Sequence, residues 1–157
     1  MRPLGPTLGP VLVQLPPSLA YEGRRAAAFF RALRSLHAGP VACEPRHASW
    51  YTPAAERLLG AHAIARVAAD PPMPAAAATP GGDPSLVYLR MHGSPHRYYS
   101  EYGDERVAAI VQTARAASAH ATVWCVFDNT ASGAATADAL RARAQMSVLR
   151  EMLSGSR

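Results

Sequence analysis

The chain has 157 residues, the length of one domain that can bury a substantial core, and 49% of them are hydrophobic, which excludes a disordered chain. No apolar run is long enough to span a membrane, and the N-terminus lacks the layout of a signal peptide, so a cytoplasmic location is expected. The formal net charge is +5, yet there is no lysine and the arginines are spread from Arg2 to Arg157. Such scattered charge favours a solvated surface over a nucleic-acid patch, so nucleic-acid binding is kept only as a less favoured alternative, and no membrane partner is expected.

Five apolar runs predict β-strands, and each run ends in polar residues. They are Pro10–Pro16, Val41–His47, Ala63–Asp70, Leu86–Gly93 and Thr122–Asn129.

Between these runs the apolar residues recur with helical spacing and predict four helices. They are Tyr21–Leu36, Thr52–Gly60, Asp104–Ala119 and Ser132–Leu153. Strands alternating with helices predict a single α/β domain over residues 1–157 with parallel strands. The Pro/Ala/Gly-rich stretch Pro71–Pro84 has no periodicity and is expected to be a surface loop outside the sheet.

Five strands are too few for a complete (β/α)8 barrel, which needs about 250 residues. A small doubly wound sheet fits the length, but the glycine-rich phosphate-binding motifs are missing, so no cofactor is predicted. Cys43 and Cys125 match no zinc motif and are expected to be reduced, buried thiols. Composition alone leaves a small open sheet and part of a barrel as alternatives.

Four motifs follow one another in a fixed order: LGPVLVQLPPS at 8–18, CEPRHASW at 43–50, VYLRMHG at 87–93 and VFDNTASGAATADA at 126–139. This order resembles the YecE-like family that carries the label domain of unknown function 72. The resemblance implies a TIM-barrel-like fold, here incomplete, with about five βα units and the N-terminal units absent. The chain departs from the family pattern at Pro45 and at Asp138, where asparagine is common. The family has no settled activity.

Ligands of parallel α/β proteins bind at the C-terminal ends of the strands, so the polar strand ends are expected to converge on one pocket. Glu44 and Arg46 share one strand face and His47 lies on the other. The arginine favours the ionised carboxylate, which makes Glu44 a candidate base or ligand anchor. The alternative is a structural ion pair.

Arg90 and His92 share a face with Tyr88, and a guanidinium beside an imidazole suits an anionic or hydroxylated ligand. Alternatively, Arg90 pairs with Glu44 across the barrel. At the end of the last run, Asn129 is the candidate pocket residue and Asp128 the candidate helix cap.

Gln14 either binds a ligand or holds its own loop. The first hypothesis is an enzyme that acts by acid/base chemistry on a small polar or anionic ligand, such as a sugar or sugar phosphate. Its catalytic residues would be Glu44 and His92, and no metal is expected. The ligand-binding residues would be Gln14, Arg46, His47, Arg90 and Asn129. The alternative is a non-catalytic binding module that needs a partner to complete the barrel, with self-association through exposed sheet edges.

Overall fold

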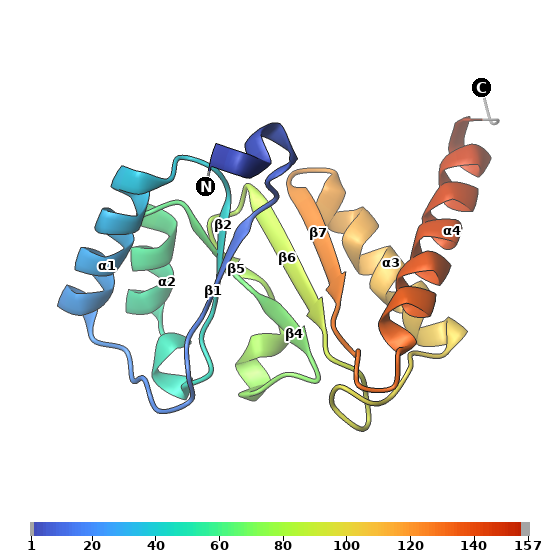
Figure 1. Ribbon diagram of the computed structural model, residues 1–157, viewed down its shortest axis with the longest axis horizontal. Helices are drawn as coiled ribbons and strands as arrows, with labels where there is room; N and C mark the ends of the chain where they lie inside the picture. Colours follow the sequence, from blue (N-terminus) through green and yellow to red (C-terminus); the bar gives the residue numbers. More distant parts are fainter. Residues whose placement is uncertain (1, 155–157) are drawn as a thin grey trace. The chain divides into compact units, whose positions relative to one another are not determined.

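The computed structural model describes residues 2–154, which form four α-helices, seven strands and three short 3₁₀ helices (Figure 1). The helices are α1 (Gly23–Leu36), α2 (Pro53–Ala61), α3 (Asp104–Ser118) and α4 (Ala134–Ser154). The strands are β1 (Val11–Gln14), β2 (Val41–Glu44), β3 (Ile64–Arg66), β4 (Ala68–Asp70), β5 (Gly81–Gly82), β6 (Leu86–Met91) and β7 (Thr122–Phe127). The 3₁₀ helices are η1 (Arg2–Thr7), η2 (Ala48–Trp50) and η3 (Ala75–Ala78). Within the described residues no helix is long and apolar enough to cross a membrane.

The chain forms two compact units, which are described separately. The first comprises Met1–Ala68 and Pro72–Tyr88, and the second comprises Ala69–Pro71 and Leu89–Arg157. All four predicted helices are present, with ends within about two residues of the predicted ones.

The first unit contains a four-stranded sheet in the order β1-β2-β3-β5. Strands β1, β2 and β3 are parallel, as predicted, and Gln14 lies opposite Glu44 in the register of β1 with β2. The core of this unit includes Phe30 of α1 and Trp50, which is 3% exposed. Helix α2 begins as its Thr-Pro sequence predicts, because the Thr52 hydroxyl accepts a hydrogen bond from the Ala55 amide.

The predicted strand Ala63–Asp70 is two strands, β3 and β4, which belong to different sheets. Between them the Val67 amide still donates to the Cys43 carbonyl (2.9 Å). An unbroken apolar run gives no local signal for the point at which a strand changes its partner, so the sequence pattern could not locate this break.

The expectation that all of Pro71–Pro84 lies outside the sheet is wrong, because β5 pairs antiparallel with β3. The buried Arg66 side chain holds this stretch by an ion pair with Glu56 and a hydrogen bond to the Thr79 carbonyl (3.0 Å). Glu56 also accepts a hydrogen bond from the Gly82 amide (2.7 Å). A paired arginine and carboxylate therefore order a segment that has no periodicity of its own.

The second unit contains α3, α4, β7 and the C-terminal residues of β4 and β6, and these three strands form a sheet in the order β4-β6-β7. The arrows of β6 and β7 run side by side in the same direction in Figure 1. Backbone hydrogen bonds join the strand ends, from the His92 amide to the Asp70 carbonyl (2.7 Å) and from the Asp128 amide to the Met91 carbonyl (3.0 Å). The C-terminal ends of the three strands therefore meet at one edge.

Two glycines of the first unit provide a matched test of the β5 pairing. Gly82 has φ +69°, and a Cβ there would lie 2.3 Å from the Ile64 carbonyl oxygen. Gly82→Ala should therefore lower the free energy of unfolding by about 3 kcal/mol. Gly60→Ala should raise it by about 0.5 kcal/mol, since the new Cβ in α2 meets its nearest atom at 3.6 Å. Urea unfolding measures both, and equal stability of the two variants would contradict the pairing.

Candidate functional site

The first unit carries a buried ion pair at the end of β2. Glu44 is buried, and its Oε1 lies 2.9 Å from Nη2 of the largely buried Arg46. The contact agrees with the expectation that these two side chains share a face. Neighbouring Gln14 is exposed at the end of β1, where the Leu15 amide donates to the Glu44 carbonyl (3.0 Å). A carboxylate and a guanidinium are thus fixed together at the C-terminal ends of β1 and β2.

His47 makes local contacts in the turn that follows β2. Its Nδ1 accepts a hydrogen bond from the Ser49 amide (3.2 Å) and lies 2.8 Å from the Ser49 hydroxyl. The ring therefore caps the 3₁₀ helix η2. Its predicted role in ligand binding stays a prediction.

The two cysteines are free thiols. Burial, and next the charge of Glu44, raise the pKa of Cys43 to about 12. Burial raises the pKa of Cys125 to about 11. Because the thiolate is the nucleophile, both cysteines are poor nucleophiles near neutral pH. Cys43 is buried, as predicted, whereas Cys125 is only partly buried.

The second unit brings Arg90 and His92 of the β6 end together on one carboxylate, Asp128, at the end of β7. Asp128 Oδ2 lies 2.7 Å from Arg90 Nη2, and its Oδ1 lies 2.7 Å from His92 Nδ1. The side chains of Arg90 and Asp128 are 16% and 20% exposed, whereas the His92 side chain is fully buried. We call these three residues the Asp128 cluster. It joins a guanidinium, a carboxylate and an imidazole at the C-terminal edge of the sheet.

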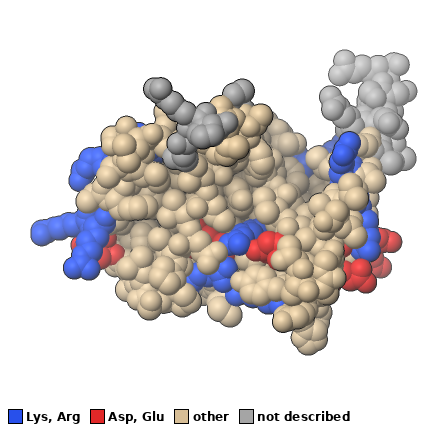
Figure 2. Space-filling model, in the orientation of Figure 1, with Lys and Arg blue, Asp and Glu red and all other residues tan. Residues whose placement is uncertain are grey.

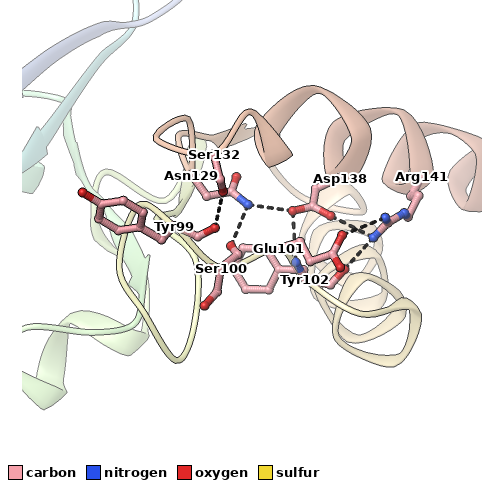
Figure 3. A network of polar contacts seen from close by, with 8 residues as sticks. All are labelled: Tyr99, Ser100, Glu101, Tyr102, Asn129, Ser132, Asp138 and Arg141. Carbon is pink, nitrogen blue, oxygen red and sulfur yellow. Dashed lines mark hydrogen bonds and ion pairs between the residues drawn. The ribbon is translucent and has the colours of Figure 1, made fainter.

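Asn129 lies beside this cluster in the sequence but belongs to a buried network with α4 (Figure 3). Its Nδ2 donates to the Ser100 carbonyl (2.9 Å) and to Asp138 Oδ2 (2.7 Å). Asp138 is fully buried and also accepts from the Tyr102 amide (3.0 Å) and from Arg141 Nη1 (3.0 Å). The Asn129 amide thus holds the loop that follows β6, and its predicted contact with a ligand is untested.

Tyr102 fixes the backbone around the Asp128 cluster. Its buried hydroxyl donates to the Asp70 carbonyl (3.0 Å) and accepts from the Gly93 amide (2.9 Å), while burial raises the pKa of this phenol. Gly93 has φ +90°, and a Cβ there would lie 2.6 Å from the Ser100 carbonyl oxygen. The loop can therefore pass this close to the strand end because residue 93 is glycine.

The predicted site residues fall into two groups, one in each unit. Gln14, Glu44, Arg46 and His47 lie in the first unit, and Arg90, His92 and Asn129 lie in the second. The convergence of the two groups on one pocket stays a prediction. The contact of Asp128 with both Arg90 and His92 does not follow from its interpretation as a helix cap. The signal for it in the sequence is the position of Asp128 at a strand end, beside Asn129.

Among the described residues no group of three or more His, Cys, Asp or Glu side chains could hold a metal ion. Figure 2 shows the basic side chains at several separate places on the visible face, some of them beside acidic side chains.

Parallel strands that alternate with helices and carry polar side chains at their C-terminal ends define a mixed α/β protein. A family model described as "Protein of unknown function DUF72" matches residues 1–156. The chain therefore belongs to the DUF72 family, which confirms the resemblance carried by the four sequence motifs.

Crystal structures of two DUF72 family proteins have a similar fold. The protein from Enterococcus faecalis V583 is 21% identical, with a TM-score of 0.73 over 88% of this chain and 58% of its own. The protein from Thermotoga maritima MSB8 is 24% identical, with a TM-score of 0.70 over 87% of this chain and 56% of its own. This chain thus spans less than two thirds of the length of either protein. No curated protein matches the chain.

The shared carboxylate of the Asp128 cluster can be tested by its charge. Asp128→Asn should lower the free energy of unfolding by about 2 kcal/mol. The amide has the shape of the carboxylate but lacks the negative charge that faces Arg90 and His92. The control is Glu101→Gln, which removes the charge of a carboxylate that is 67% exposed and paired with Arg141, and should change stability by less than about 0.5 kcal/mol. Chemical denaturation compares the two variants; similar effects would show that Asp128 is only a surface charge.

Proposed function

We propose that this protein is an enzyme that acts on a small polar or anionic ligand by acid/base chemistry at the C-terminal ends of its strands. The Asp128 cluster carries the proposal, because one carboxylate contacts both an arginine and a fully buried histidine. Such a carboxylate fixes the orientation of an imidazole and stabilises the positive charge that the ring gains with a proton. His92 is then the acid/base group and Asp128 its positioning residue.

Arg90 gives the proposed ligand class. A guanidinium next to an acid/base histidine binds carboxylate or phosphate oxygens through parallel N–H donors, so the ligand carries an anionic group, as a sugar phosphate does. The Arg90 and Asp128 side chains are partly exposed, which is compatible with access of a small molecule. Glu44 with Arg46 remains the second proposed catalytic pair, and we propose the incomplete TIM-barrel-like fold as the scaffold.

Thermal unfolding with a defined set of compounds tests this function. We expect a sugar phosphate, such as glucose 6-phosphate or ribose 5-phosphate, to raise the melting temperature of the wild type more than glucose or inorganic phosphate does. Arg90→Ala and His92→Ala should each weaken binding of that compound by about tenfold or more. The exposed Arg143 of α4 provides the control Arg143→Ala, which should bind like the wild type. Equal binding by all variants, or no response of the wild type to these anions, would contradict the proposal.

The second candidate function is a binding module that pairs with another polypeptide, and the sheet orders favour it. Strand β1 ends the order β1-β2-β3-β5, and β7 ends the order β4-β6-β7. Terminal strands present unpaired backbone groups to further strands.

Light scattering during size-exclusion chromatography tests self-association through these edges. If another copy completes the sheet, the mass should rise from one chain toward two as the protein concentration increases. A mass of one chain at every concentration, together with a cooperative unfolding transition, would show that no second copy is required.

A further inference from the structure

Tyr98 adopts a backbone conformation that an aromatic residue rarely takes. Its φ is +70°, and within residues 2–154 Ala63 is the other non-glycine residue with positive φ. The left-handed region is disfavoured for residues that carry a Cβ, and bulky side chains are uncommon there. Glycine would adopt the same turn without strain, so the turn itself does not explain why residue 98 is a tyrosine.

The structure around Tyr98 holds the residue in this conformation from both sides. Its amide donates to the His92 carbonyl (2.5 Å), and its carbonyl accepts from the Ala131 amide (3.0 Å). The following residues are tied down as well, since Ser132 donates to the Tyr99 carbonyl and Asn129 donates to the Ser100 carbonyl (Figure 3). Strain that is maintained by several surrounding bonds tends to occur at functional sites.

The ring of Tyr98 packs against the imidazole of the Asp128 cluster. The ring centroids of His92 and Tyr98 are 5.5 Å apart, and the planes are inclined by 84°, an edge-to-face contact. The imidazole thus contacts Asp128 at Nδ1 and Tyr98 at its ring. Tyr98 itself is 37% exposed, so one residue both contacts the buried imidazole and reaches solvent.

We propose that Tyr98 is the positioning residue that orders the His92 imidazole, an inference that rests on the acid/base function proposed above. The left-handed backbone brings an aromatic ring onto His92 immediately after the strand end, in a turn of a few residues. The ring is the part of Tyr98 that acts, so phenylalanine should replace it and alanine should not.

The test uses four variants of the full chain without any ligand: Tyr98→Phe, Tyr98→Ala, Tyr98→Gly and the control Tyr99→Ala. Tyr99 is exposed and points away from the buried network in Figure 3. Two measurements report on His92: relaxation of its ring carbons by nuclear magnetic resonance, and its rate of modification by diethyl pyrocarbonate. The exposed His120, which lies after the end of α3, is the internal reference for the modification rate.

The His92 ring should be rigid and protected from modification in three proteins: the wild type, Tyr98→Phe and Tyr99→Ala. In Tyr98→Ala and Tyr98→Gly it should become mobile and react about tenfold faster, while the reactivity of His120 does not change. Tyr98→Gly should unfold at a higher urea concentration than Tyr98→Ala, because glycine relieves the backbone strain.

A rigid, protected His92 in Tyr98→Gly would overturn the inference, whatever the stability of the variants. If Tyr98→Ala does not fold, Tyr98→Gly and Tyr98→Phe still decide. These measurements need no substrate, so a negative result would count against the role of Tyr98 alone. The proposed function fails by a different result, namely sugar-phosphate binding that is insensitive to Arg90→Ala and His92→Ala.

Discussion

The structure depends on contacts between opposite charges, because a charged side chain that is removed from water must meet an opposite charge or hydrogen-bonding partners. Within each unit, charged side chains at strand ends and on helices lie against a partner of opposite charge or against a histidine. The pairs are Glu44 with Arg46, Glu56 with Arg66, Asp128 with Arg90 and His92, and Asp138 with Arg141. The same pairs fix loops and strand ends, so the polar groups that form the candidate site also determine the local fold around it.

Periodicity predicted the helices and the parallel strands, because burial of one helix face or of a whole strand is encoded in consecutive residues. It could not predict where the run Ala63–Asp70 divides or that Gly81–Gly82 joins β3, since both depend on partners elsewhere in the chain. The Arg66–Glu56 pair that holds β5 joins residues of β3 and α2, and no local pattern records it.

The contacts of the candidate site residues were only partly predictable from the sequence. Alternation along a strand correctly placed Glu44 and Arg46 on one face. Alternation does not indicate which neighbouring strand supplies the partner of a side chain. Asp128 was therefore interpreted as a helix cap, whereas in the structure it contacts both Arg90 and His92. Asn129 was interpreted as a pocket residue, yet its amide bonds to Ser100 and Asp138, and only the fold reveals that α4 carries a buried carboxylate there.

The two tryptophans lie in different units, Trp50 in the core of the first and Trp124 on β7 of the second. Trp50 is 3% exposed and Trp124 is 41% exposed, so their emission should differ in colour, blue-shifted for the former and red-shifted for the latter. Each unit therefore contains its own intrinsic fluorophore. Replacing one tryptophan at a time would leave a single optical probe, which would reveal whether the two units lose their structure in one cooperative step or in succession.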